Sequence, residues 1–188
     1  MRIFISGGCK NGKSTWAQKL AKKQQREGGR LYYLATMIPH DGEDRQRVAR
    51  HRQEREGWGF ETVEAGKIDG LRLPQTDRNS SLLLDSVTAL LANEMFREDG
   101  SVFPEAYHQV EQALRILFAR FENIVAVSDG IYSDAFIYDE LTERYRQGLA
   151  HLDRALAGVS DIVLEACFGK LIAHKGEARM REITDGLD

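Results

Sequence analysis

Short, continuous apolar runs alternate along the chain with longer segments in which apolar residues recur every three or four positions. The runs lack the in-and-out alternation of a half-exposed strand. They therefore predict β-strands covered on both faces, at residues 2–6, 31–36, 81–85, 123–129 and 161–168. The helical spacing is clearest over residues 103–121 and 141–156. Strands alternating with helices predict an α/β fold, with a mainly parallel sheet and helices on both of its faces.

Composition and length are typical of one soluble domain, expected over residues 1–188, in which residues 66–80 form a polar loop. The chain is 42% hydrophobic and 29% charged with a net charge of −3, so it lacks the basic excess of a nucleic-acid-binding surface. Cys9 and Cys167 are too few for a disulfide framework, and no apolar run reaches membrane-span length. The first apolar run ends at Gly7 without a cleavage-like segment. We therefore expect a cytoplasmic protein with no nucleic-acid partner and no membrane span.

The first predicted strand leads into a glycine-rich stretch that precedes a helical pattern. The complete phosphate-binding pattern G-x-x-x-x-G-K-[ST] is present in Gly7, Gly8, Cys9, Lys10, Asn11, Gly12, Lys13 and Ser14. Glycines let successive backbone N–H groups face phosphate oxygens, and the helix N-terminus adds positive potential. Lys13 would reach the β- and γ-phosphates and the Ser14 hydroxyl would bind Mg²⁺. The stretch predicts a P-loop NTPase-like fold that binds a nucleotide. A regulatory GTPase is disfavoured, because the chain lacks an Asn/Thr-Lys-x-Asp guanine motif.

A magnesium-bound nucleotide calls for an acidic side chain at the end of a neighbouring strand. Asp85 closes the run 81–85 and is the first candidate. Asp129, at the end of the run 123–129, is the second candidate. Either residue could instead cap the helix that follows it, which is a common role for aspartate at such a position.

A highly charged, arginine-rich segment over residues 41–64 allows a second kind of chemistry. Helical spacing places Arg47, His51 and Arg55 on one face. One interpretation is a solvated charged helix. The other is a nucleophilic site, because a neutral imidazole can attack phosphorus while guanidinium groups hold phosphate oxygens and favour the neutral form of the ring. That chemistry would require the helix 41–56 to fold over the phosphate loop.

Four motifs together resemble those of the adenosylcobinamide kinase / adenosylcobinamide-phosphate guanylyltransferase family. They are the loop 7–14, the segment 33–36 (YLAT), the segment 47–55 (RVARHRQER), and Trp58 with Thr62 and Glu64. The segment 82–96 resembles the family's next strand and helix, with Asp85 at the usual acidic position. The family's strand order implies that this strand lies next to the one that carries the loop. The resemblance covers roughly residues 1–172, and the histidine motif is its most specific part.

The resemblance implies a bifunctional transferase that assembles the nucleotide loop of cobalamin. Such an enzyme phosphorylates adenosylcobinamide from ATP or GTP, then transfers GMP from GTP through a GMP–histidine intermediate. By position His51 is the nucleophile and Lys13 is the second catalytic residue, with Mg²⁺ on Ser14 and Asp85. Beyond the phosphate loop, the positions that match the family's guanine-nucleotide contacts are Thr36, Met37, Ile38, Arg52, Gln53, Glu54, Arg55, Glu64 and Asp85. The resemblance also implies a homotrimer and a corrinoid acceptor.

The chain departs from the family's pattern after two of its predicted strands and after the histidine motif. Residues 128–134 replace an N-E-V-G-x-G segment, residues 165–169 replace a G-I-P-like turn, and Glu56 stands where a proline is usual. We expect these differences to lie on the acceptor side of the site. Two alternatives therefore stay open: a P-loop kinase of another small-molecule alcohol, and a nucleotide-sensing module without turnover.

Overall fold

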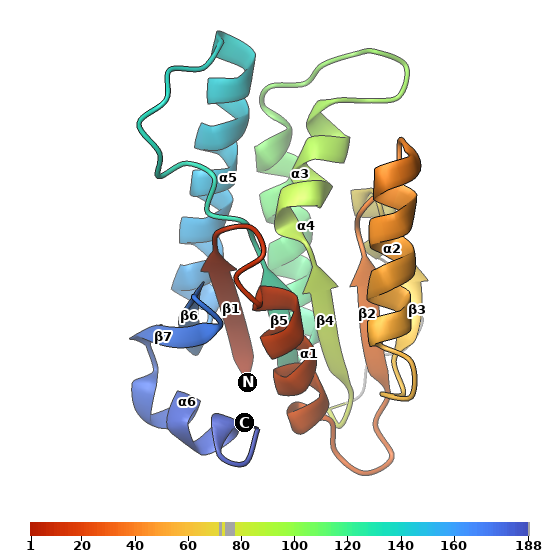
Figure 1. The fold of residues 1–188 in the computed structure, drawn as a ribbon, viewed down its shortest axis with the longest axis vertical. Helices are drawn as coiled ribbons and strands as arrows, with labels where there is room; N and C mark the ends of the chain where they lie inside the picture. The colour runs from red at the N-terminus through yellow and green to blue at the C-terminus, as the bar shows by residue number, and fades with distance from the viewer. Residues whose placement is uncertain (72, 74–77, 188) are drawn as a thin grey trace.

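A computed structural model describes residues 1–71, 73 and 78–187, with the backbone alone at residues 47 and 54. Within this part of the chain the strands form one sheet in the order β3-β2-β4-β5-β1-β6-β7 (Figure 1). The first six strands along the chain are parallel to their neighbours, and β7 is antiparallel to β6. The strands are β1 Arg2–Gly7, β2 Leu31–Ala35, β3 Glu61–Glu64, β4 Ser81–Asp85, β5 Asn123–Val127, β6 Ile162–Cys167 and β7 Lys170–Lys175.

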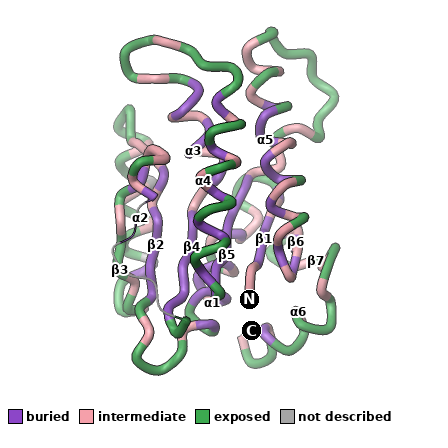
Figure 2. The backbone as a smooth tube through the Cα atoms, turned by 180° about the vertical axis from the view of Figure 1, so that it is seen from behind, coloured by how far each residue is buried: buried purple, intermediate pink, exposed green. Residues whose placement is uncertain are grey.

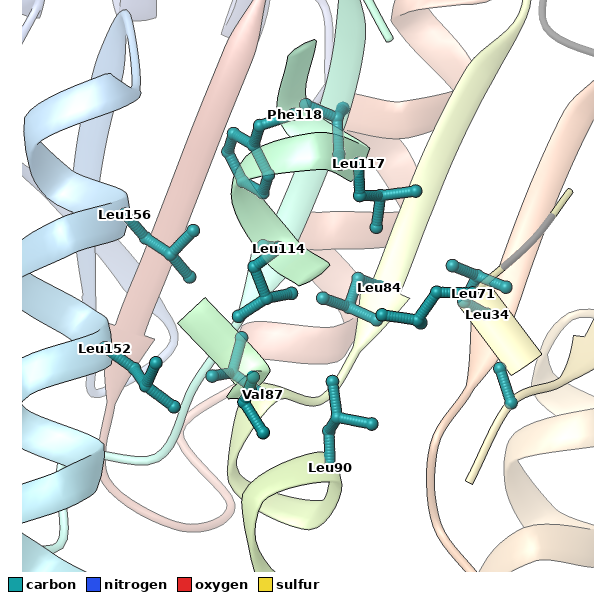
Figure 3. Packing of buried hydrophobic residues seen from close by; sticks show 14 of the residues in the cluster. Leu34, Leu71, Leu84, Val87, Leu90, Leu114, Leu117, Phe118, Leu152 and Leu156 are labelled. Carbon is teal, nitrogen blue, oxygen red and sulfur yellow. The ribbon is translucent and has the colours of Figure 1, made fainter. Parts of the chain in front are cut away.

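Helices cover both faces of the sheet, as Figures 1 and 2 show from opposite sides. The residues of α3, α4 and α5 pack into one apolar cluster with β2, β4 and β5, part of which is shown in Figure 3. The opposite face packs against α1 and α6. The helices are α1 Lys13–Gln24, α2 Gly42–Glu54, α3 Val87–Met95, α4 Ala106–Arg120, α5 Glu140–Val159 and α6 Glu177–Thr184, with a 3₁₀ turn η1 at Ile68–Leu71.

The burial of β4 explains the continuous apolar runs in the sequence. Leu82 and Leu84 belong to the cluster on one face and Leu83 to the cluster on the other. Since successive side chains of a strand point to opposite faces, a strand covered on both sides must be apolar throughout. The five predicted strands are confirmed as β1, β2, β4, β5 and β6, although β5 ends at Val127 and not at residue 129.

Two strands and one buried segment do not follow the sequence prediction. The edge strands β3 and β7 were not predicted, because their side chains are mostly exposed and polar. The prediction of a polar loop over residues 66–80 is wrong in part, since η1 lies there and Leu71 and Leu73 are buried in the core. Residues 72 and 74–77 of that segment lie outside the described residues.

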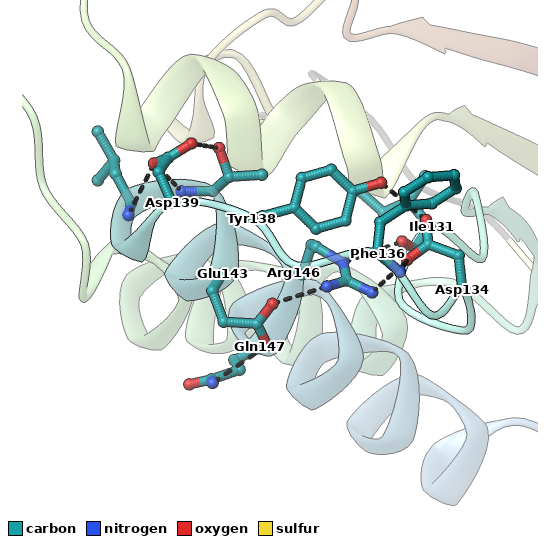
Figure 4. A network of polar contacts seen from close by, with 10 residues as sticks. Ile131, Asp134, Phe136, Tyr138, Asp139, Glu143, Arg146 and Gln147 are labelled. Carbon is teal, nitrogen blue, oxygen red and sulfur yellow. Dashed lines mark hydrogen bonds and ion pairs between the residues drawn. The ribbon is translucent and has the colours of Figure 1, made fainter.

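The connection from β5 to α5 is organised by one arginine side chain (Figure 4). Arg146 is only 9% exposed and forms ion pairs with Asp134 at 2.9 Å and Glu143 at 2.7 Å. Its Nε donates to the carbonyl oxygen of Ile131, and its guanidinium lies 4.5 Å from the ring centroid of Tyr138. This arginine therefore ties both ends of the connection to the first turns of α5.

Candidate active site

The phosphate loop lies where the sequence predicts it, between the end of β1 and the start of α1. Gly7 and Gly12 have φ values of 148° and 84°, a region that favours glycine. A Cβ atom at Gly7 would also collide with the carbonyl oxygen of Ala166 in β6. These glycines are therefore required by the backbone path, which turns the chain back over the end of the sheet.

The lysine of the loop is paired with an acid from the neighbouring strand. The Nζ of Lys13 lies 2.8 Å from Oδ1 of Asp129 and donates to the carbonyl oxygen of Gly8 at 2.6 Å. The backbone N–H of Asp129 donates to the Thr88 hydroxyl, which fixes this acid at the carboxyl end of β5. A phosphate that enters the loop would compete with the carboxylate for the charge of Lys13.

The strand order corrects one expectation about Asp85. Its strand, β4, pairs with β2 and β5, so β5 separates it from the loop-bearing strand β1. Of the two candidate acids, it is Asp129 that follows a strand next to β1. Neither acid caps a helix: the N-cap of α3 is Ser86 and that of α5 is Asp139.

Two adjoining cavities at this edge of the sheet bring the predicted residues together. One has a volume of about 250 Å³ and reaches toward Arg55 and Glu64, and the other, about 530 Å³, covers the phosphate loop. Their walls share residues from the loop, α2 and both candidate acid strands: Ser14, His51, Asp85, Ser86 and Asp129. The helix that carries the histidine therefore borders the same space as the phosphate loop, as nucleophilic chemistry would require.

The arginine-rich helix α2 is more than a solvated surface. Arg55, at its carboxyl end, is 6% exposed, and its guanidinium carbon lies 3.5 Å from the ring centroid of Tyr33. The Tyr33 hydroxyl in turn donates to Oδ2 of Asp85 at 2.7 Å. One turn earlier, Arg52 pairs with Glu64 of β3 at 2.6 Å. The side chains of residues 47 and 54 lie outside the described part of the structure.

The segment after β2 has a mixed role. Thr36 is fully buried, and its hydroxyl both donates to the Ser86 carbonyl and accepts from the Ser86 N–H. Met37 lines the smaller cavity, whereas the Ile38 side chain packs against Gly66. Thr36 thus holds the start of α3 in place, next to the cavities. Gln53 lies farther out, in a shallow hollow with Arg52, Arg55 and Glu64.

A buried acid behind the site was not found from the sequence. Asp153 of α5 is 4% exposed and accepts a hydrogen bond of 2.8 Å from the Tyr132 hydroxyl. Burial, helped by the negative charge of Asp129, raises the pKa of Asp153 to about 6, although its hydrogen bonds lower the pKa in part. Burial also raises the pKa of Tyr132, as does the carboxylate beside it. The sequence signal that could have revealed Asp153 is its position on the apolar face of the predicted helix 141–156.

Metal binding has to be judged from the donor set. In the described residues no group of three or more histidine, cysteine or acidic side chains is arranged to hold a metal ion. Ser14 and Asp85 nevertheless border both cavities. Mg²⁺ in nucleotide sites typically takes one or two protein oxygens and completes its shell with phosphate oxygens and water. These two residues fit that pattern.

In the part of the chain that the structure describes, Cys9 and Cys167 are free thiols, and none of the helices could cross a membrane.

Comparison with known proteins gives one consistent family. The family model described as cobinamide kinase / cobinamide phosphate guanyltransferase matches residues 3–173. The bifunctional adenosylcobalamin biosynthesis protein CobU of Escherichia coli is 32% identical over 130 residues, which is 67% of each chain. The corresponding CobP of Pseudomonas aeruginosa is 28% identical over 177 residues, 94% of this chain and 99% of its own length. Among solved structures, the flagellar accessory protein FlaH from Methanocaldococcus jannaschii is similar with a TM-score of 0.46 and 12% identity, covering 92% of this chain and 77% of its own.

Proposed function

This chain belongs to the cobinamide kinase / cobinamide phosphate guanyltransferase family, and from that premise we propose how its site performs the two transfers. It is a bifunctional transferase of adenosylcobalamin biosynthesis. It phosphorylates adenosylcobinamide and then attaches GMP from GTP to the new phosphate. The family match favours this function over a kinase of an unrelated alcohol and over a sensing module.

In the kinase step, the phosphate loop holds the triphosphate of ATP or GTP with Lys13 against the β- and γ-phosphates. Nucleotide binding draws Lys13 away from Asp129, whose carboxylate then faces the same space. We assign Asp129 to accept the proton of the acceptor hydroxyl. The hydroxyl oxygen attacks the γ-phosphorus, the bond from that phosphorus to the bridging oxygen breaks, and a nucleoside diphosphate leaves.

Magnesium is expected to accompany the nucleotide. Ser14 and Asp85 would hold it, together with phosphate oxygens. When bound, Mg²⁺ neutralises charge on the phosphates. The Tyr33 hydroxyl, donating to Asp85 at 2.7 Å, orients this carboxylate toward the cavities.

In the guanylyl step, His51 attacks the α-phosphorus of GTP. A nitrogen–phosphorus bond forms, the bond to pyrophosphate breaks, and GMP remains on the imidazole. The phosphate of adenosylcobinamide phosphate then attacks the same phosphorus and releases His51. Arg52 and Arg55 stand beside this histidine and stabilise the non-bridging oxygens. The ion pair of Arg52 with Glu64 beside a surface hollow supports a guanine position there.

One observation carries this mechanism: His51 and the phosphate-loop serine border the same two cavities. The test is incubation with α-labelled GTP, followed by a count of acid-labile label on the protein. We expect His51→Ala to lose labelling and GMP transfer while it still phosphorylates adenosylcobinamide. His108→Ala, which alters an exposed histidine of α4, serves as the control and should be labelled normally. Labelling of the His51→Ala protein would reject the covalent intermediate.

Two broader proposals remain, the first from the family resemblance and the second from the composition of the chain. We expect a homotrimer, to be checked by the mass of the particle in solution, and we place the enzyme in the cytoplasm. A monomer at working concentrations would contradict the first of these. Neither proposal is needed for the chemistry above.

A further inference from the structure

The turn between β6 and β7 contains a residue that its geometry disfavours. Cys167 and Lys170 are paired, so the turn consists of Phe168 and Gly169, with φ values of 50° and 78°. Positive φ at both central positions is the pattern of a type I′ turn, for which Asn-Gly is the preferred sequence. A phenylalanine in the left-handed region is disfavoured because of its Cβ atom.

Burial does not explain the phenylalanine either. The Phe168 side chain is 93% exposed, so its ring makes almost no contribution to the apolar core. An unfavourable backbone conformation that presents an apolar ring to solvent is a feature that points to a function.

The position of this turn suggests which function, and it differs from the acceptor side expected from the sequence, because the turn lies against the phosphate loop. The Cα of Gly169 lies 3.6 Å from where a Cβ of Gly12 would stand, so the turn touches the phosphate loop. The indole N–H of Trp16, in the first turn of α1, donates to the Gly169 carbonyl oxygen at 2.9 Å. Because β6 is paired directly with β1, the turn is held beside the helix N-terminus that receives the phosphates.

We propose that the Phe168 ring stacks on the base of the nucleoside triphosphate that donates the phosphoryl group in the kinase step. This rests on the proposed function, and it adds a second base position to the one beside Arg52 and Glu64. The two positions lie on opposite sides of β1, because β6 borders it on one side while β5, β4 and β2 lie on the other (Figure 1). One phosphate loop then serves two nucleotide orientations, with Trp16 as the residue that positions the turn.

The test compares two ligands that share phosphates and differ in the base. Affinities for ATP and for inorganic tripolyphosphate, both with Mg²⁺, are measured by calorimetry on the full chain without acceptor. Phe168→Asn should weaken ATP binding by roughly 5- to 100-fold, since base–aromatic stacking has about this effect. Tripolyphosphate binding should stay within twofold, and Phe168→Trp should bind ATP as the native protein does. Phe168→Asn also creates the preferred turn sequence, so its melting temperature should rise by a few degrees.

Ile137→Asn, at a fully exposed apolar position between β5 and α5, is the matched control and should bind both ligands normally. The proposal is overturned if Phe168→Asn binds ATP as tightly as the native protein, or if both ligands weaken equally. It is also overturned if the particle mass falls in the variant, because the ring would then be a contact between copies of the chain. Since no acceptor is present, a selective loss of ATP binding supports the base position even if phosphorylation of adenosylcobinamide is never observed.

Discussion

At the scale of single residues, the Asp85 carboxylate combines a structural contact with a predicted metal contact. Its Oδ2 accepts from Tyr33, and Tyr33 stacks under Arg55. Asp85→Asn keeps an oxygen acceptor for Tyr33 but loses the negative charge that Mg²⁺ prefers. We therefore expect normal folding, lower activity in both steps, and a higher Mg²⁺ concentration for half-maximal rate. Titration of the rate with Mg²⁺ measures this, and an unchanged requirement would transfer the metal role to Asp129.

A second residue-scale prediction concerns the pH dependence of stability. Burial raises the pKa of Asp153 in the folded protein to about 6, above its ordinary value of about 3.9. Between these values the folded state holds a proton that the unfolded state releases, so the free energy of unfolding falls as pH rises through this range. The cost at neutral pH is about 3 kcal/mol, from about 1.4 kcal/mol for each pKa unit.

Asp153→Asn removes this cost and can still accept the hydrogen bond from Tyr132. Urea unfolding should show the variant more stable by about 2–3 kcal/mol at pH 8, with the difference disappearing toward pH 4. A variant that is less stable at both pH values would mean that the carboxylate is well solvated or needed for packing.

At the scale of elements, the connection between β5 and α5 depends on Arg146 (Figure 4). Arg146→Met keeps an unbranched apolar stem but removes the guanidinium, which leaves Asp134 and Glu143 without their common partner. Because both acids are partly exposed, we expect a loss of about 1–3 kcal/mol, less than for a fully buried pair. Chymotrypsin should also cut more rapidly at Phe136 and Tyr138.

The neighbouring Arg144 provides the matched control for that experiment. Its side chain is 51% exposed, and its ion pairs with Glu105 and Glu140 are long, at 3.6 and 3.9 Å. Arg144→Met should change the free energy of unfolding by less than about 0.5 kcal/mol. Equal effects of the two substitutions would show that the buried position of Arg146 has no special importance.

At the scale of the whole molecule, nucleotide binding should stabilise the fold as one unit, since we propose a single domain over residues 1–188. At a nucleotide concentration near 100 times Kd the stabilisation is about 2.7 kcal/mol, or about 5–10 °C in melting temperature. Lys13→Ala should lose this shift together with both activities, because Lys13 supplies the charge at the β- and γ-phosphates. Lys23→Ala, an exposed lysine of α1, should keep the shift. Scanning calorimetry measures both, and a Lys13→Ala protein with a normal shift would contradict the role of this lysine.

The sequence by itself determined the elements whose signal is local. The runs that became β1, β2, β4, β5 and β6 are apolar because both faces of the sheet are covered. The phosphate loop could be located because its glycines, lysine and serine are adjacent along the chain, between a strand and a helix. The sequence also predicted which face of α2 carries His51 and Arg55, since residues four positions apart lie on one side of a helix.

The tertiary structure alone decided which of these elements are neighbours. Strand order depends on long-range packing, so no local pattern shows that β5 separates Asp85 from the loop, or that Asp129 pairs with Lys13 across the sheet edge. The contact of Arg55 with Tyr33 joins residues from different elements, and the edge strands lack the apolar pattern because one side of each faces solvent. No local pattern shows that Phe168 is exposed and that its turn lies against the phosphate loop, because exposure and proximity are properties of the folded chain.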